Sequence, residues 1–359
     1  MKHPFNPKTL CHAMTAVLML SCAKPLPETE GNLPPGDGDL VQVLFWADEG
    51  RSRLTNVDDE AENRIRRWTI FAFDRQDPWF TYASSSSERT LPLRLRKGRT
   101  YTCYALVNYP LSGPCAFSPA SIREEAQLSG KVSTLEDNSE ASLVMYGRMP
   151  VTVEEDAQQF SFPVTRTVSR VDIKSIRTDF SENPSLASKS FVLKHIYLTN
   201  LYRTTRYGSD YSYAELSASR SAWYNTMGWH RGESGVTGMD TLIEARNLNI
   251  PLSAEHAYEL SHSFYVYPNP TTPAQDSHDT GQWSKRCSRI VLETSLDGEI
   301  LYYQATLPEM VRNRIYSARS IVIKGKGSQD PEALVYDPEN PPIIVDWNDD
   351  WDMDEEKEL

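Results

Sequence analysis

The chain alternates short apolar stretches with turn residues, and the apolar positions follow the spacing of β-strands. Two stretches, 40–46 (LVQVLFW) and 68–73 (WTIFAF), are apolar at odd and even positions alike. We therefore expect both strands to be covered on both faces. A third stretch, 91–95, alternates cleanly, and Pro92 favours the edge of a sheet. Further strands are expected at 101–107, 168–176, 191–198, 264–267, 290–294, 301–305, 320–323 and 343–347.

Helical periodicity is scarce. Ser121 and Glu124 have the spacing of a capping box, which predicts one short helix over 122–128. Asp297-Gly298 predicts a hairpin turn. Residues 204–240 are rich in Tyr, Ser and Gly without a clear period, so we expect a long loop region there. The fold class that follows is all-β with minor helix, built from β-sandwiches.

The length of 359 residues is enough for two sandwiches in tandem. The strand pattern is weakest over 162–168, so we expect an N-terminal sandwich domain over 40–166 and a C-terminal one over 167–359. Residues 22–39 are rich in proline, glycine and acidic side chains, which is typical of a flexible linker.

The first 21 residues have the features of a secretory signal peptide. Lys2 and Lys8 precede a short apolar run over 13–20, which is too short to span a bilayer at the roughly 20 residues required. A cysteine, Cys22, follows directly, as in bacterial lipoprotein signals. We therefore expect lipid on Cys22 and a protein held at the membrane only by that anchor. The alternative is an ordinary secreted start with a chance cysteine.

The charge limits the classes of binding partner, and the cysteine content limits the disulfide bonds that can form. The net charge is −12, and removal of residues 1–21 takes two lysines and no acid, which gives −14. An acidic surface argues against nucleic acid and anionic membranes as partners. Three cysteines remain after the export segment, an odd number that excludes a disulfide framework. Cys103 and Cys115 could pair across a hairpin, or be free buried thiols.

No catalytic motif is present, so we expect neither an enzyme nor a cofactor. His256 and His262 lie near two glutamates, but their spacing does not place them on one helical face, and a solvated pair is the simpler interpretation than a zinc site. Carboxylates are plentiful, yet nothing singles out a glycosidase pair. Two interpretations fit the aromatic group Trp223, Tyr224, Trp229 and His230. The group could form a sugar-binding platform, or it could fill space under a long loop, which is the commoner case.

A family resemblance emerges from an ordered series of short stretches. In the C-terminal third these are 264–271 (FYVYPNPT), 290–294 (IVLET), Asp297-Gly298, Tyr302-Tyr303, Leu307-Pro308, Arg312-Asn313, Tyr316, 321–328 (IVIKGKGS), Asp330-Pro331 and 345–347 (VDW). In the N-terminal half, 65–74, 91–95 and 101–108 agree. In this order the set resembles the FimA-type fimbrillins, the subunits of lipoprotein-derived type V pili, over most of the mature chain.

The resemblance implies two transthyretin-like β-sandwiches and a life cycle at the cell surface. Such subunits are exported as lipoproteins to the outer membrane, where an arginine-specific protease removes the lipid and the first strand. A strand from another subunit then fills the groove, and the subunits form an extracellular fimbrium that supports adhesion. The implied partners are other fimbrial subunits, the protease, and a host or bacterial surface receptor.

Particular residues take these roles under the resemblance. The displaced first strand would carry Leu40, Val41, Val43, Leu44, Phe45 and Trp46. The cut is expected after Arg53, with Arg51 as second choice, since Arg64, Arg66 and Arg67 lie too close to the next strand. Without the family context, the simpler interpretation of Arg51 and Arg53 is as surface loop residues.

The C-terminal segment is the expected donor strand. Ile343, Val345 and Trp347 would project to one face, Ile344 would contact the opposite wall, and the acidic end would keep the tail soluble. A C-terminal strand that can be donated to another subunit favours a shaft subunit. The 204–240 region would suit a tip adhesin, and an uncut loop would suit an anchor. A monomeric surface lipoprotein that binds glycans or host protein is the alternative from another class.

Overall fold

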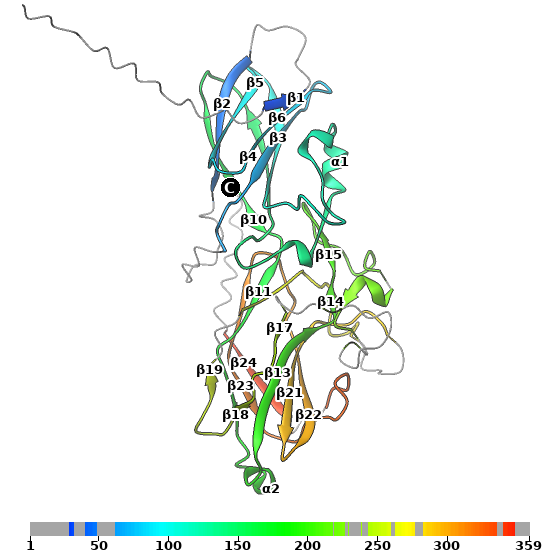
Figure 1. The fold of residues 1–359 in the computed structure, drawn as a ribbon. Coiled ribbons are helices and arrows are strands. Elements are labelled where there is room, and N and C mark those ends of the chain that lie inside the picture. The colour runs from blue at the N-terminus through cyan, green and yellow to red at the C-terminus, as the bar shows by residue number, and fades with distance from the viewer. Residues whose placement is uncertain are drawn as a thin grey trace, which may run out of the picture.

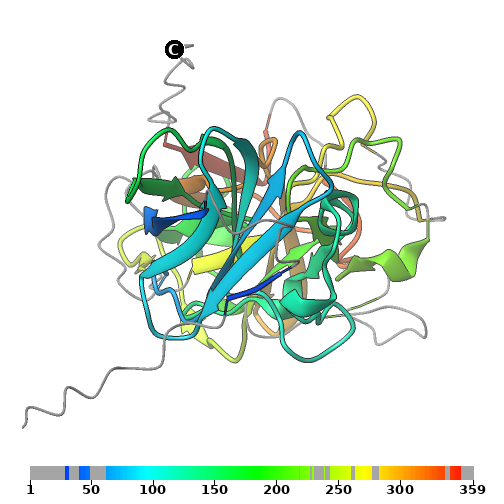
Figure 2. The same ribbon diagram turned by 90° about the horizontal axis from the view of Figure 1, so that it is seen from above.

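The computed structural model describes residues 29–31, 40–48, 62–217, 219–226, 229, 238, 243–259, 263–276, 283–335 and 340–348. The signal peptide, Cys22, Arg51, Arg53, His230 and His262 lie outside these residues. The described chain is all-β with minor helix and forms two β-sandwiches arranged end to end (Figure 1). Figure 2 looks along the long axis, with the N-terminal strands nearest the viewer.

The N-terminal sandwich has one large sheet and one small sheet. The large sheet has the order β1-β4-β3-β6-β8-β10 and the small one has the order β5-β2-β9. The bounds are β1 (Thr29–Gly31), β2 (Leu40–Asp48), β3 (Trp68–Asp74), β4 (Phe80–Ser85), β5 (Thr90–Arg96), β6 (Thr100–Val107), β8 (Met145–Thr152), β9 (Gln159–Pro163) and β10 (Thr165–Arg166).

The large sheet is buried on both faces. Ile70 and Cys103 face the small sheet, while Phe71 and Tyr104 pack under the segment that holds α1 (Glu125–Ser129). The expectation of two-sided burial for 68–73 is therefore confirmed. Pro92 lies on β5, which is an edge strand of the small sheet, as expected.

The expected helix start is wrong by three residues. Ile122 is buried in an extended conformation, so Ser121 ends a separate 3-10 turn, η1 (Pro119–Ser121), and cannot cap α1. Glu124 is the N-cap instead. The backbone N–H of Glu124 donates a hydrogen bond to the side-chain oxygen of Gln127 at 3.3 Å. The two members of the box are therefore Glu124 and Gln127.

The C-terminal sandwich also has two sheets. The first has the order β19-β12-β23-β11-β20, with β24 on β23, and the second has the order β17-β13-β21-β22, with β18 on β13. The bounds are β11 (Ser169–Ile173), β12 (Ser175–Thr178), β13 (Phe191–Thr199), β17 (Glu244–Ala245), β18 (Ile250–Pro251), β19 (Tyr258–Glu259), β20 (Ser263–Val266), β21 (Arg289–Leu296), β22 (Glu299–Thr306), β23 (Ile315–Ile323) and β24 (Ile343–Trp347).

One interrupted strand and one hairpin turn in this sandwich bear on the sequence predictions. The strand expected over 168–176 is interrupted between β11 and β12, both of which run parallel to β23. The hairpin at Asp297-Gly298 is confirmed: both residues have positive φ, 49° and 90°, as a type I′ turn requires.

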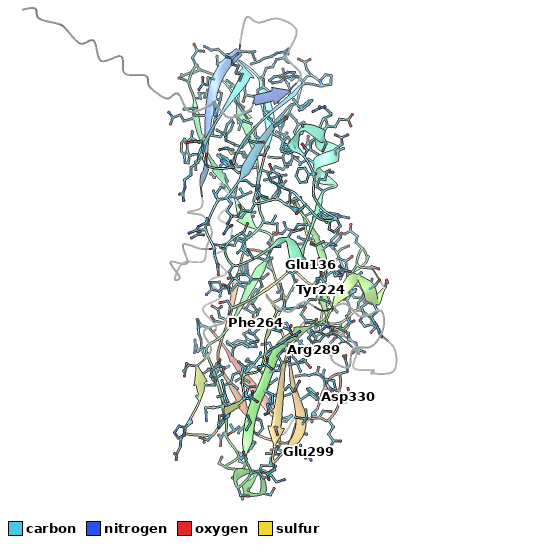
Figure 3. All side chains as sticks on the ribbon, viewed as in Figure 1. Glu136, Tyr224, Phe264, Arg289, Glu299 and Asp330 are labelled. Atoms are coloured by element: carbon cyan, nitrogen blue, oxygen red, sulfur yellow. The ribbon has the colours of Figure 1, made fainter. Side chains whose placement is uncertain are left out.

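The remaining elements are short. They are β7 (Val132–Thr134), η2 (Leu135–Asp137), α2 (Pro184–Ala187), β14 (Leu201–Tyr202), β15 (Thr204–Arg206), η3 (Arg220–Ala222) and β16 (Trp223–Tyr224). β15 pairs with β7 and so joins the two halves of the chain. Tyr224 donates a hydrogen bond to Glu136 at 2.5 Å across the same junction (Figure 3).

A buried polar group, which we call the joint cluster, holds the two halves together: Glu62, Arg166, Arg170, Asp172 and Tyr265. Arg170 donates to Glu62 Oε1 at 2.7 Å and binds both oxygens of Asp172, at 2.8 and 2.9 Å. Tyr265 also donates to Glu62. Burial works against the charge of Asp172, but the hydrogen bonds and charge of Arg170 hold its pKa below the ordinary value.

The three cysteines in the described part of the chain are free thiols. Cys103 is fully buried in the core on β6, and burial raises the pKa of its thiol. Cys115 is half-buried, and Cys287 is buried with a pKa raised to about 11, chiefly by burial. The alternative of a hairpin disulfide between Cys103 and Cys115 is therefore wrong, and the buried thiol alternative holds for Cys103.

Candidate functional site

The first strand of the core, β2, is inserted between two other strands. It pairs antiparallel with β5 from Leu40↔Arg96 to Trp46↔Thr90 and parallel with β9 from Leu44↔Gln159 to Asp48↔Pro163. Both of its edges are thus hydrogen-bonded. Its removal would leave two unpaired strand edges facing each other across a gap.

One face of β2 completes the core. Val43 and Phe45 are fully buried, and Val41 packs against the same core from a half-buried position. The Phe45 ring lies 5.7 Å from Phe160 and 6.2 Å from Phe162, measured between ring centroids. These contacts make the inward side chains of β2 an integral part of the N-terminal sandwich.

The expectation that 40–46 is covered on both faces is wrong. Gln42 is exposed, Leu44 is half-buried and Trp46 is 37% exposed, while Leu40 is half-buried at the start of the strand. The physical reason is the layering: the small sheet is an outer layer, and its outward side chains meet solvent. An apolar residue on that face is tolerated singly at a surface and does not signal a second buried layer.

The last described strand, β24, lies at the edge of the C-terminal sandwich. It pairs antiparallel with β23 from Ile343↔Ile323 to Trp347↔Ala318, on the edge of β23 that β11 and β12 leave open. Its ends are fixed by two backbone bonds, Lys324 N–H to Pro342 O at 2.9 Å and Asn348 N–H to Ser317 O at 2.8 Å.

The side chains of β24 alternate as the sequence indicates. Ile343, Val345 and Trp347 are half-buried and pack against the core, so the structure brings these three together on one face. Ile344 is 41% exposed and Asp346 is exposed on the other face. In this conformation β24 therefore completes the edge of the C-terminal sandwich beside β23.

The expected cleavage residues Arg51 and Arg53 lie outside the described residues, between the end of β2 and Glu62. The nearby arginines are tied down. Asn108 accepts from the backbone N–H of Arg66 at 2.9 Å and donates to the carbonyl of Arg64 at 2.9 Å. Arg67 donates to the carbonyl of Tyr109 at 2.9 Å. A protease that binds an extended chain would have to break these bonds, and the choice of Arg53 or Arg51 over this segment stays a prediction.

The aromatic group around 223–230 is divided by the structure. Trp223 and Tyr224 are fully buried, so a platform made from them is wrong. They fill space under the loops: Trp223 lies 5.1 Å from Tyr202 and 5.5 Å from Trp283, between ring centroids. Trp229 is different, because it packs on Tyr197 and lines a surface pocket of about 520 Å³.

The described residues also bear on metal binding and on membrane insertion. Within them, no three or more His, Cys, Asp or Glu side chains gather as metal ligands would. His256 is exposed, and its ring nitrogen lies 3.2 Å from the hydroxyl of Ser253. No helix in the described segments is long and apolar enough to cross a membrane.

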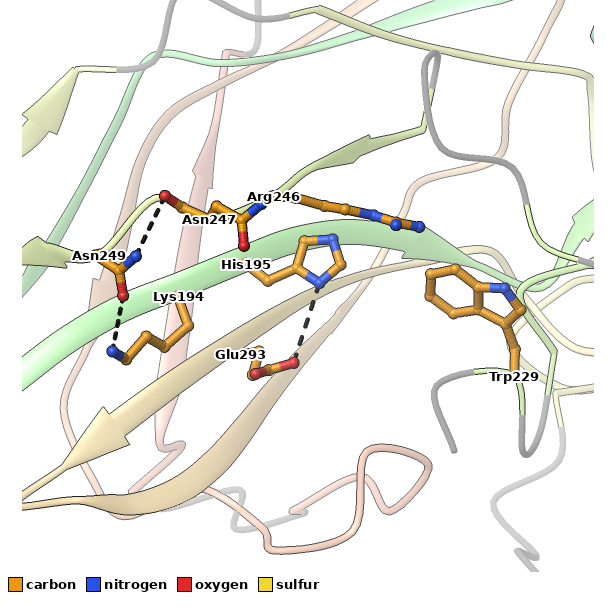
Figure 4. A pocket seen from close by; sticks show the side chains of 7 residues that line it. All are labelled: Lys194, His195, Trp229, Arg246, Asn247, Asn249 and Glu293. Atoms are coloured by element: carbon orange, nitrogen blue, oxygen red, sulfur yellow. Dashed lines mark hydrogen bonds and ion pairs between the residues drawn. The ribbon is translucent and has the colours of Figure 1, made fainter. Parts of the chain in front are cut away.

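The pocket is what the sequence reasoning missed. Its lining comes from β13, β21, the connection between β17 and β18, and Trp229, which are far apart in the sequence. Only Trp229 carried a signal, as one member of an aromatic-rich stretch. The lining residues are Lys194, His195, Trp229, Arg246, Asn247, Asn249 and Glu293 (Figure 4).

Comparison with known proteins is informative at the level of structure. No protein-family model matches the chain. No curated protein matches it significantly. Among solved structures, a candidate cell adhesion protein from Parabacteroides distasonis matches with a TM-score of 0.59 and 14% identity, covering 88% of this chain and 98% of that one.

Two further matches are named as fimbrial proteins. The fimbrilin FimA from Porphyromonas gingivalis has a TM-score of 0.56 and 13% identity, covering 86% of this chain and 97% of that one. The tip fimbrial protein Mfa3 from Porphyromonas gingivalis has a TM-score of 0.52 and 14% identity, covering 86% and 98%. Over most of its length, this chain therefore has the fold of the fimbrilins and related cell adhesion proteins.

Proposed function

We propose that this protein is a structural subunit of a cell-surface fimbrium and works by strand exchange without catalysing a reaction. It is exported with the signal peptide 1–21, lipidated at Cys22 and held at the outer membrane through the linker 22–39. Cleavage after Arg53 or Arg51 then frees β2. A C-terminal strand from another subunit replaces it, and the product is an extracellular fibre that supports adhesion.

The observation that carries the proposal is the contrast between β2 and β24. β2 is bonded on both edges and supplies core side chains, so its loss opens a defined groove. β24 is a short edge strand in which half-buried and exposed positions alternate, with Ile343, Val345 and Trp347 on the buried face. The domain division at 166/167 belongs to the same proposal; it places β2 in the first domain and β24 in the second.

The free energies involved are large enough to support a persistent non-covalent fibre. The core-facing side chains of β2 are Val41, Val43 and Phe45, and burying a replacement set contributes about 1.5–3 kcal/mol for each fully buried side chain. Each backbone hydrogen bond restored adds about 1 kcal/mol net. The donor side chains also leave a half-buried site on β23, so the net gain comes mainly from completing the two-edged groove.

Arginine-specific cleavage is expected to start assembly. Treating the folded precursor with trypsin-like protease should trim it after Arg53 or Arg51 and yield a ladder of SDS-resistant multimers. The double variant R51A/R53A should stay untrimmed and monomeric, because the tied arginines at 64–67 offer no alternative site. The variant R177A, with a half-buried arginine on β12, should behave like the parent. A trimmed chain that remains monomeric would exclude the trigger.

Mass spectrometry of the mature surface protein tests the processing separately. The proposal expects two forms: a precursor that begins with lipidated Cys22, and a fibre form that begins directly after Arg53 or Arg51. A surface protein found only in the lipidated form would instead identify an anchor that retains β2. A mature N-terminus without lipid near residue 22 would exclude the lipoprotein route.

A further inference from the structure

The outward face of the C-terminal sheet β17-β13-β21-β22 carries the pocket of about 520 Å³ described above. Figure 4 shows β13 crossing its floor, with His195 at the centre, Glu293 on β21 below it, and Trp229 closing one end. Asn249 and Lys194 lie at the opposite end. Neither β2 nor β24 contributes a residue to the pocket lining, so the pocket is a site separate from the two strands of the proposed exchange.

The aromatic wall is supported from beneath. Trp229 packs on Tyr197 with 5.3 Å between ring centroids, and Tyr197 in turn lies 4.9 Å from the His195 ring. Tyr197 belongs to a buried cluster with Val291 and Tyr302. A side chain at Gly238 would clash with the indole, so the backbone at Gly238 approaches Trp229 closely. These contacts hold the indole in place as one wall of the pocket.

The polar lining is arranged before any ligand arrives. His195 Nε2 lies 3.1 Å from Glu244, which also pairs with Arg246, and His195 Nδ1 lies 4.0 Å from Glu293. Lys194 donates to Asn249 at 2.8 Å. Asn247 and Asn249 both have positive φ, 57° and 52°, an uncommon conformation that marks the β17–β18 connection as a shaped segment.

The charges that line the pocket are mixed. Lys194 and Arg246 carry one positive charge each, and Glu293 carries one negative charge. Arg246 pairs with the buried Glu244, and Lys194 donates to the neutral amide of Asn249. The carboxylate of Glu293 in the lining disfavours an anionic ligand, and the other groups offer hydrogen-bond donors and acceptors at short range.

From this combination we infer that the pocket binds a neutral saccharide unit, such as the exposed end of a surface glycan. The indole of Trp229 offers an apolar face against the C–H groups of a pyranose ring. The amides of Asn247 and Asn249, the carboxylate of Glu293 and the imidazole of His195 offer donors and acceptors for neighbouring hydroxyls. This binding activity is separate from strand exchange and does not require it.

A glycan panel with neutral, sialylated and sulfated members tests the inference on the purified protein. The wild-type protein should bind neutral glycans, and W229A should weaken that binding at least tenfold. E293Q keeps the shape of the pocket and should weaken binding several-fold. The control W46A removes another partly exposed tryptophan, on β2, and should bind like wild type. Circular dichroism and thermal melting establish that each variant is folded.

The outcomes separate cleanly. Loss of binding in W229A and E293Q, with W46A unaffected, supports the site. Wild-type protein that binds none of the neutral glycans, or only acidic ones, overturns the neutral saccharide assignment. Neutral glycan binding that survives both W229A and E293Q places the receptor site elsewhere. If W229A alone is unfolded, E293Q and the W46A control decide the result.

Discussion

The variant E62Q is expected to lower the free energy of unfolding by about 3–5 kcal/mol, because it removes one charge from a buried ion pair. Glu62 is almost fully buried and accepts from Arg170 at 2.7 Å and from Tyr265. The substitution keeps the shape of the side chain, so the loss reports on charge rather than on a cavity. Chemical denaturation followed by tryptophan fluorescence measures the effect.

The matched control is E155Q, which makes the same chemical change at an exposed position of the N-terminal half. Its free energy of unfolding should stay within about 0.5 kcal/mol of the parent. If E62Q unfolds with the same midpoint as E155Q, the joint cluster does not hold the two sandwiches together. A selective loss of only one unfolding transition would show that the halves unfold separately.

This result bears on the proposed processing. Glu62 lies after Arg51 and Arg53 in the chain, so a cut at either residue leaves the joint cluster intact while it frees β2. A cut after Arg64 or Arg67 would instead detach Glu62 and leave Arg170 with Asp172 as its remaining buried acid. The position of the cluster therefore gives a physical reason for cleavage on the N-terminal side of Glu62.

Deletion of residues 342–359 is the second large effect and should abolish multimer formation by the trimmed protein. The deletion removes β24, including Ile343, Val345 and Trp347, which are the apolar side chains that the donor strand would insert. The fold should survive, because β24 is an edge strand and β23 retains β11 and β12. Gel electrophoresis without boiling measures assembly, and circular dichroism measures folding.

A shorter deletion serves as the control. Stopping the chain after Asn348 removes the acidic tail but keeps β24, so this variant should still form multimers. Equal assembly by the parent and by the chain without 342–359 would exclude β24 as the donor. Loss of assembly in both truncated chains would assign the essential role to the acidic tail instead.

The strand pattern predicted most of the fold because buried strands carry a local signal. Residues 68–73, 101–107 and 290–294 lie within strands with long apolar runs, and their bounds differ from expectation by only one to a few residues. β8 was missed because Gly147, Arg148 and Pro150 interrupt the pattern. Pro150 is tolerated because β10 pairs with β8 only at its start, and no other described strand pairs with the rest of that edge.

Layering and long-range geometry could not be predicted in the same way. Residues 40–46 are apolar on both faces, but only the tertiary arrangement shows that none of the described residues forms a layer over the outward face of the small sheet. β9 pairs in parallel with β2 across more than a hundred residues, a contact that leaves no local signal. The pocket depends on the same kind of convergence, and its polar residues are unremarkable in their own segments.

Under the proposed strand exchange, the exposed outer face of the small sheet relaxes what is required of the donor strand. A groove walled on one side requires apolar groups at every second position only, so its occupant can be amphipathic. Asp346 breaks the apolar sequence of β24 on the side that needs no burial. A groove that is buried on both sides would require a donor strand that is apolar at every position. Such a strand would readily form aggregates while it is unpaired.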